Sequence, residues 1–247
     1  MNKLIKKTAL IAAALAVSAA AGLIVTGKRI GWGPFASLYD WDGETDLIRD
    51  RYDLSRQREI IFYGASNFRL WKEMEEDLKD YKVQNHGFGG STDKLLIRYA
   101  DKLLYPYDPA IIVFQTGSND YVSLKGDENE VYEQCIAVKK EMFTQFHERL
   151  PEAKMIVLSG ILMPGRDDYT PIVRRVNAFL REFCEESDYL YYVDSEEMTF
   201  IDDYIKEYFI KDGIHLAHEA RLLWRDQYIR PMLEKVIEAY GLQEVRK

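Results

Sequence analysis

The sequence predicts a three-layer α/β/α domain, in which helices cover both faces of a parallel five-stranded sheet. From residue 59 on, short apolar runs alternate with longer stretches of helical spacing. The apolar runs are continuous rather than alternating with polar residues, which indicates strands buried on both faces, as in a parallel sheet. A chain of 247 residues with 47% hydrophobic residues can fill one such core.

Each expected strand is a short run rich in Ile, Val, Phe or Tyr. The runs lie at residues 59–63, 81–84, 110–116, 154–162 and 190–193. Helical spacing is found between them, at residues 67–79, 92–104, 128–149 and 170–186, and a closing helix is expected at 217–239. Ligands of such sheets collect at the carboxyl ends of the strands, so we expect the chemistry there.

The amino terminus has the pattern of a membrane segment. Three lysines among the first seven residues precede an uncharged run over residues 8–27, and about 20 apolar residues suffice to span a bilayer. The positive-inside rule would keep the lysines cytoplasmic. Residues 1–29 are therefore expected to anchor an extracytoplasmic catalytic domain in the membrane. The alternative is a cleaved signal peptide and a secreted protein, because Ala19–Ala21 offers a small-residue cleavage site.

Composition and charge indicate the domain boundaries and limit the possible partners and metal sites. Residues 30–57 lack a sustained period and are expected to form a juxtamembrane segment that leads to a domain at 58–247. The net charge is -8 and no basic block follows the first residues, which argues against nucleic acid as a partner. Cys135 and Cys184 show no CxxC or Cys/His spacing, so no zinc site and no disulfide scaffold are expected. The sequence predicts neither a cofactor nor a metal.

Four polar segments stand at or after the expected strand ends. They are GASN (64–67), NHGFGGST (85–92), TGSND (116–120) and, near the end of the chain, DGIH (212–215). Taken singly, each is compatible with a turn or a helix cap, and Ser66 is a favoured residue type at a helix start. Together they provide the groups that a serine ester hydrolase needs: a hydroxyl, a base, a group that orients the base, and donors for the oxyanion.

In order and position, these segments resemble the four motif blocks of the SGNH hydrolases, also called GDSL lipases or esterases. The resemblance covers roughly residues 59–235 and implies a flavodoxin-like sheet with serine esterase activity. It assigns Ser66 as the nucleophile, His215 as the base and Asp212 as the carboxylate that orients the base. The base and its carboxylate lie three residues apart, so one short loop can position both and fix the imidazole tautomer.

The same resemblance implies an oxyanion hole made of Ser66, Gly90 and Asn119. Gly90 would donate its backbone N–H, and Asn119 its side-chain amide. A glycine lets the backbone approach the substrate closely, and an amide is a neutral donor that needs no protonation. At a helix start, the backbone N–H of Ser66 would point to the same place as its hydroxyl, and the helix dipole would favour negative charge there.

One position departs from the family pattern, and the site residues have two other interpretations, a metal site and an α/β-hydrolase. Ala65 stands where the family usually has an aspartate; that aspartate is not the base, so the triad stays complete, but reduced or altered activity is left open. Asp212, His215 and His218 are an alternative metal site, although their spacing matches neither HExxH nor another metal pattern. An α/β-hydrolase would need glycine, in its G-x-S-x-G elbow, where Phe68 stands.

The sequence therefore predicts a serine esterase that removes acyl groups, O-acetyl groups above all, from an envelope or dietary glycan. Its expected partners are a small-molecule or glycan ester and the membrane. An acyltransferase, in which an acceptor hydroxyl replaces water, is the alternative among enzymes. A member that only binds a ligand is the alternative outside enzymes, suggested by Ala65. The loops at 121–129 and 164–168 carry no pattern that identifies the acyl chain or the alcohol.

Overall fold

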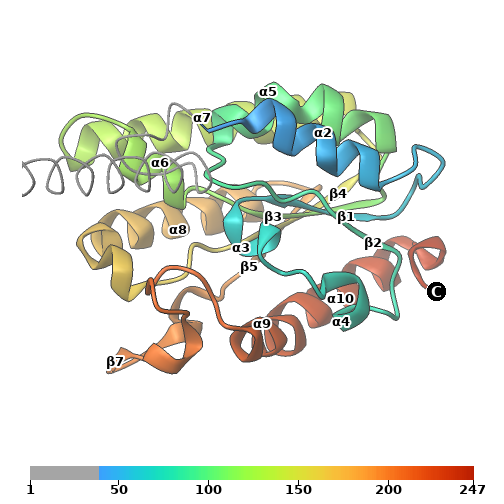
Figure 1. Cartoon of the computed structure of the whole chain (residues 1–247). Helices are drawn as coiled ribbons and strands as arrows, with labels where there is room; N and C mark the ends of the chain where they lie inside the picture. Colours follow the sequence, from blue (N-terminus) through green and yellow to red (C-terminus); the bar gives the residue numbers. More distant parts are fainter. Residues whose placement is uncertain (1–38) are drawn as a thin grey trace, which may run out of the picture. The chain divides into compact units, whose positions relative to one another are not determined.

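The computed structural model describes residues 39–247, and its centre is an all-parallel five-stranded sheet. The strand order is β2-β1-β3-β4-β5 (Figure 1). The strands are β1 (Ile60–Gly64), β2 (Val83–Asn85), β3 (Ile111–Gln115), β4 (Lys154–Leu158) and β5 (Leu190–Val193). Each expected strand is present, so the fold class predicted from the continuous apolar runs is confirmed.

The two central strands explain why continuous apolar runs predicted a parallel sheet. β1 and β3 are buried along their whole length and pair in register from Ile60 with Ile111 to Gly64 with Gln115. β4 is shorter than the apolar run that predicted it. Its neighbour β5 ends at Val193, which pairs with Leu158, so the chain beyond β4 has no strand to pair with and continues as a loop.

The long helices also agree with the prediction. They are α5 (Asp93–Leu103), α7 (Glu128–Arg149), α8 (Thr170–Glu185), α9 (His218–Trp224) and α10 (Arg230–Tyr240), with a π-helical turn at Arg225–Ile229 between the last two. α5 and α7 cover one face of the sheet, and α9 and α10 lie on the other (Figure 1). A small antiparallel pair, β6 (Phe200–Ile201) and β7 (Asp203–Tyr204), follows β5.

The helix expected at residues 67–79 is instead two short helices, α3 (Ser66–Arg69) and α4 (Met74–Asp77). The side chain of Asn85 contacts the chain at the break. Its Nδ2 donates to the carbonyl oxygens of Phe68 at 2.7 Å and Trp71 at 3.2 Å, which occupies acceptors that a continuous helix would use. The prediction of one helix was therefore wrong: at the break these carbonyls accept the N–H groups of Trp71 and Met74, three residues ahead, together with the side chain of Asn85.

The segment before the domain contains a helix that its periodicity did not reveal. α2 (Trp41–Arg51) begins with Asp42 and Glu44 and ends with Arg49 and Arg51, an arrangement that matches the helix dipole. Within residues 39–247, no helix has the length and apolar character needed to cross a bilayer. The anchor or signal peptide expected at 1–29 lies outside the described residues and stays a prediction, as do the boundaries at 30–57 and 58–247.

Candidate active site

The sharp turn from β1 into α3 positions Ser66. A Cβ on Gly64 would lie 2.3 Å from the carbonyl oxygen of Gln115, so only glycine lets the end of β1 approach β3 this closely. Two residues beyond Ser66, the fully buried Phe68 stacks on Trp224 with ring centroids 6.0 Å apart. The core therefore holds α3 on both sides of the serine. Because α3 has only four residues, first-turn N–H groups, rather than a long helix dipole, act at Ser66.

Ser66, His215 and Asp212 form a continuous chain of hydrogen bonds. His215 Nε2 lies 2.7 Å from Ser66 Oγ, and His215 Nδ1 lies 2.6 Å from Asp212 Oδ2. The other carboxylate oxygen, Oδ1, accepts the backbone N–H groups of Ile214 at 2.9 Å and His215 at 3.0 Å. With Nδ1–H donating to the carboxylate, Nε2 is left to accept the proton of the serine hydroxyl.

The carboxylate of this chain is kept ionised by its hydrogen bonds. Burial raises the pKa of Asp212, but the hydrogen bonds from the His215 ring and from the backbone N–H groups of His215 and Ile214 outweigh burial, so the pKa lies below its ordinary value. The Asp212 side chain is 40% exposed and that of His215 only 19%. The carboxylate is thus more exposed than the imidazole that it contacts.

Asn67 joins the nucleophile segment to the base segment. It follows Ser66 directly, is buried, and its Oδ1 accepts the backbone N–H of Leu216 at 3.1 Å. Leu216 in turn follows His215. The bond thus links α3 to the loop of the base across 149 residues of sequence. The sequence analysis gave Asn67 no role; its position in the GASN segment was the only available signal.

The other two proposed oxyanion donors lie next to each other. Gly90 has a φ of 65°, a left-handed conformation that favours glycine. Asn119 lies in α6 (Ser118–Ser123), and its Nδ2 donates to the carbonyl oxygen of Ser91 at 2.9 Å. This bond joins the segments after β2 and β3, and Ser91 Oγ in turn donates to the Gly64 carbonyl, two residues before Ser66, at 3.1 Å. An amide nitrogen carries two hydrogens, so the second N–H is left for a substrate oxygen.

Arg166, to which the sequence analysis gave no role, contacts Asn119 from the other side. It lies in the 3₁₀ segment Pro164–Tyr169. Its Nη2 donates to Asn119 Oδ1 at 3.1 Å, and its Nη1 donates to the carbonyl oxygen of Ser118. Both ends of the Asn119 amide are therefore hydrogen bonded. The residues at 164–168 had appeared as a loop without a pattern.

A buried charged cluster lies behind the oxyanion donors. Lys139 Nζ is 2.9 Å from Asp93 Oδ2, and neither side chain is more than 1% exposed. The carboxylate of Asp120 accepts the backbone N–H of Asp93, and Thr116 donates its hydroxyl to Asp93. Burial lowers the pKa of Lys139, but the charges of Asp93 and Asp120 outweigh burial and raise it. Burial and the charge of Asp93 raise the pKa of Asp120.

Side chains that suggested other chemistry lie apart from this arrangement. His218 Nδ1 faces Glu73 Oε2 at 3.8 Å, while both ring nitrogens of His215 are taken up by the serine and the aspartate. In the part of the chain that the structure describes, no three His, Cys, Asp or Glu side chains converge as a metal site. Cys135 and Cys184 are buried free thiols, and burial raises the pKa of each to about 12.

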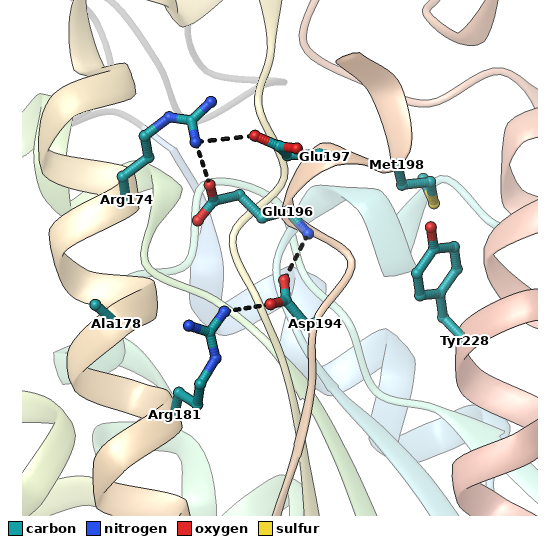
Figure 2. A pocket seen from close by; sticks show the side chains of 8 residues that line it. All are labelled: Arg174, Ala178, Arg181, Asp194, Glu196, Glu197, Met198 and Tyr228. Carbon is teal, nitrogen blue, oxygen red and sulfur yellow. Dashed lines mark hydrogen bonds and ion pairs between the residues drawn. The ribbon is translucent and has the colours of Figure 1, made fainter. Parts of the chain in front are cut away.

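The structure also contains a charged cavity of about 540 Å³ after β5. It is lined by Arg174, Ala178, Arg181, Asp194, Glu196, Glu197, Met198 and Tyr228 (Figure 2). Arg174 pairs with Glu196 and Glu197, and Arg181 pairs with Asp194. All charged lining residues are thus paired, and no proposed catalytic residue is among them, so its size alone does not mark a reaction site.

A family comparison agrees with the geometry. The model of the GDSL-like Lipase/Acylhydrolase family matches residues 61–220, well over half of the chain. The chain belongs to this family. It is therefore a serine hydrolase that acts on ester bonds, and the SGNH resemblance predicted from its motifs is confirmed. The matched range contains all five proposed site residues of this GDSL-like acylhydrolase: Ser66, Gly90, Asn119, Asp212 and His215.

Solved structures of low sequence identity share the fold of this GDSL-like acylhydrolase. A GDSL-like lipase from Bacteroides thetaiotaomicron is 15% identical, with a TM-score of 0.63 over 78% of this chain and 97% of the other. A carbohydrate esterase family 3 structure from Talaromyces cellulolyticus is 16% identical, with a TM-score of 0.57 over 73% and 98%.

A third structure, a mutant of the acetyl-xylooligosaccharide esterase Axe2 from Geobacillus stearothermophilus, is 13% identical, with a TM-score of 0.53 over 68% of this chain and 94% of the other. At such identities the likeness concerns the fold alone. A comparison with curated proteins gives no match.

Proposed function

We propose that this chain is a serine esterase that removes O-acetyl or other short acyl groups from a carbohydrate, with Ser66 as nucleophile, His215 as base and Asp212 as the orienting carboxylate. The observation that carries the proposal is the continuous hydrogen-bond chain from Ser66 Oγ through both ring nitrogens of His215 to Asp212. A hydroxyl needs such a base to become a nucleophile at neutral pH.

The reaction follows from this geometry. Ser66 Oγ attacks the carbonyl carbon of the ester while its proton moves to His215 Nε2, and the imidazolium is stabilised by Asp212. Collapse of the tetrahedral intermediate breaks the bond to the alcohol oxygen, which takes the proton from Nε2. Water then attacks the acyl-enzyme with His215 again as base, and the carboxylic acid leaves.

The negative charge of each tetrahedral intermediate requires fixed donors. The proposed donors are the backbone N–H groups of Ser66 and Gly90 and the second amide N–H of Asn119. The bond from Asn119 Nδ2 to the Ser91 carbonyl, at 2.9 Å, supports a shared site for the last two. Donors held in place before the reaction stabilise developing charge without reorganisation.

Two observations support a short acyl group on a sugar. Axe2 and the family 3 structure are named as an acetyl-xylooligosaccharide esterase and a carbohydrate esterase. A cavity of about 280 Å³ lies close to the oxyanion segment, because Tyr121, two residues after Asn119, lines it; the rest of its lining is Tyr169, Asp168, Glu128 and apolar residues. None of the five proposed site residues lines it, but its volume, just below that of most ligand pockets, favours a small acyl group or one sugar unit over a long lipid chain in this neighbourhood.

The alanine at position 65 does not weaken the proposal. Its side chain is buried, with 2% exposed, and the hydrogen-bond chain of the triad does not pass through it. Its backbone N–H donates to the Gln115 carbonyl at 3.2 Å, so it shares in the pairing that holds the turn before Ser66.

We keep the extracytoplasmic, membrane-anchored location as a proposal from the sequence.

Turnover of a panel of esters tests the proposed function. The full chain should hydrolyse p-nitrophenyl acetate and acetylated xylo-oligosaccharides faster than p-nitrophenyl octanoate, and Ser66→Ala should abolish turnover with an unchanged circular dichroism spectrum. Equal turnover by the Ser66→Ala variant would remove this serine from the mechanism. Transfer of acetyl to an added sugar in preference to water would identify an acyltransferase. The absence of turnover in the wild-type protein would favour a ligand-binding role.

A further inference from the structure

The segment Pro164–Tyr169 touches both halves of the proposed site. Gly165 donates its backbone N–H to the carbonyl oxygen of Gly213, at 2.8 Å, within the loop that carries Asp212 and His215. A Cβ on Gly165 would lie 2.6 Å from the Asp212 carbonyl oxygen, so the two loops are in direct backbone contact. The next residue, Arg166, reaches the oxyanion side. One short segment thus connects the loop of the base with the amide of Asn119.

The contacts of Arg166 determine which way the Asn119 amide faces. The amide oxygen accepts from the guanidinium at 3.1 Å, and the amide nitrogen donates to the Ser91 carbonyl at 2.9 Å. A flipped amide would place N–H groups against the guanidinium and oxygen against the carbonyl, so neither bond could form. The orientation that satisfies both partners is the one that leaves an N–H for the substrate oxygen.

The two contacts of Arg166 also require the shape of arginine. Nη1 and Nη2 donate to acceptors on consecutive residues, the carbonyl oxygen of Ser118 and Oδ1 of Asn119. A planar guanidinium supplies two such donors in a fixed geometry, whereas the ammonium group of lysine is a single point. Replacement of the arginine by lysine would keep the charge and lose the two-point contact.

The charge of Arg166 acts on the same amide. Burial lowers the pKa of Arg166, while Tyr169, Asp212 and Tyr121 oppose the effect of burial. A guanidinium nevertheless stays protonated in proteins. A cation bonded to the amide oxygen draws electron density from the nitrogen and makes each remaining N–H a stronger donor. Its Nε is buried and has no hydrogen-bond partner among the described residues. The guanidinium is therefore held through Nη1 and Nη2.

We propose that Arg166 is the positioning residue of the oxyanion hole: it fixes the orientation of the Asn119 amide and strengthens the N–H that stabilises the tetrahedral intermediate. The inference rests on the proposed function, because it gives Asn119 the role of oxyanion donor. Arg166 itself touches no reacting atom. Its removal should therefore lower the rate of the chemical step and leave substrate binding unchanged.

Kinetics of three variants test the role. Arg166→Lys and Arg166→Ala should each lower kcat by about 10- to 100-fold on p-nitrophenyl acetate, with KM unchanged, since part of the contribution of one oxyanion donor is lost. Added guanidinium ion should restore part of the lost kcat in Arg166→Ala and none in Arg166→Lys, with sodium chloride as the salt control. Arg181→Gln is the control, because Arg181 pairs with Asp194 and lies over the Tyr192 ring, away from Asn119, and this variant should keep wild-type kinetics.

The outcomes separate this role from others. A kcat close to wild type in both Arg166 variants would overturn the proposal, and a rise in KM alone would show that Arg166 binds substrate instead. A merely structural role would lower the melting temperature without rescue by guanidinium. In contrast, failure of the proposed function would appear in the wild-type protein itself, as the absence of turnover.

A second measurement does not depend on activity. The side-chain amide signals of Asn119 in a nitrogen–proton NMR spectrum, identified by their loss in Asn119→Asp, should shift and broaden in Arg166→Lys but stay unchanged in Arg181→Gln. Unchanged Asn119 signals in Arg166→Lys would contradict the proposal whether or not the protein is an esterase.

Discussion

The two halves of the proposed site are held in place by different means. The base and its carboxylate sit on one loop, where Asp212 accepts two backbone N–H groups from residues two and three positions ahead. The oxyanion donors sit on two loops that meet through the Asn119–Ser91 bond, with Arg166 on one side and the Lys139 cluster behind. The pairing of the base with its carboxylate is therefore set by local sequence, whereas long-range contacts set the pairing of the oxyanion donors.

From this difference we expect substitutions in the triad to stop the reaction and substitutions on the oxyanion side only to slow it. A change in the triad removes a group that transfers or orients a proton, and no other residue in the site can replace that group. A change on the oxyanion side removes one donor or its support among several. The expected effects therefore decrease from the triad to the residues that hold the two halves together.

The largest effects are expected in the triad. His215→Ala should lower kcat by about 10⁵- to 10⁶-fold, because the serine hydroxyl stays protonated at neutral pH, and Asp212→Ala should cost less, about 10⁴-fold. Steady-state kinetics on one activated ester measures both. An equal loss for the two variants would mean that the carboxylate does more than orient the imidazole.

The buried cluster should control stability more than rate. Lys139→Met leaves Asp93 and Asp120 without their cation, and loss of one partner of a buried pair typically costs about 3–5 kcal/mol of unfolding free energy. Urea denaturation measures the loss. The matched control is Lys140→Met, since Lys140 is the next residue on α7 and is exposed. Similar stabilities of the two variants would show that the cluster does not support the oxyanion loops.

Removal of one oxyanion donor should reduce the rate but not binding. Asn119→Ala should lower kcat by about 10²- to 10³-fold with little change in KM, because the bond forms to charge present only in the transition state. Labelling of Ser66 by a fluorophosphonate should slow but persist. A rise in KM at constant kcat would make Asn119 a substrate-binding residue.

The smallest effect is expected at Asn67, where α3 contacts the loop that carries His215. Asn67→Ala leaves the buried N–H of Leu216 without its acceptor, which typically costs about 1–3 kcal/mol of stability. Leu216 follows His215 directly, so loss of this hydrogen bond should also displace the imidazole. If the displacement raises the activation free energy by about 1.4 kcal/mol, kcat falls by about tenfold. Asn67→Asp keeps an acceptor oxygen and should lose less of both. Equal losses in the alanine and aspartate variants would argue against this acceptor role.

The sequence predicted the pairing of Asp212 with His215 because that information is local. The DGIH segment places a carboxylate and an imidazole on one loop, and the structure finds them 2.6 Å apart. The helix at 128–149 was also predicted at its observed bounds from its helical spacing, and the structure shows a local capping box of Asp127 and Glu130 at its start. Such features depend on neighbours in the chain.

The rest could not be predicted, because its partners are distant in the sequence. In an amphipathic helix, Lys139 looks like any surface lysine, and only its contact with Asp93, 46 residues away, shows that it is buried. Arg166 lies in a segment without a period, and its partner Asn119 is 47 residues away. The break between α3 and α4 likewise lies at a contact with Asn85, 14 to 17 residues away in the sequence. The motifs therefore predicted candidate reacting groups, but they did not predict the distant side chains that contact those groups.

Chemical labelling of the nucleophile tests the central claim most directly. The full chain, incubated with a fluorophosphonate, should be labelled once, on the peptide that contains Ser66, as measured by mass spectrometry. Labelling should be lost in Ser66→Ala and strongly slowed in His215→Ala, because the hydroxyl reacts only when His215 Nε2, 2.7 Å away, accepts its proton. Absence of labelling in the wild-type chain, or labelling of another serine, would contradict the account.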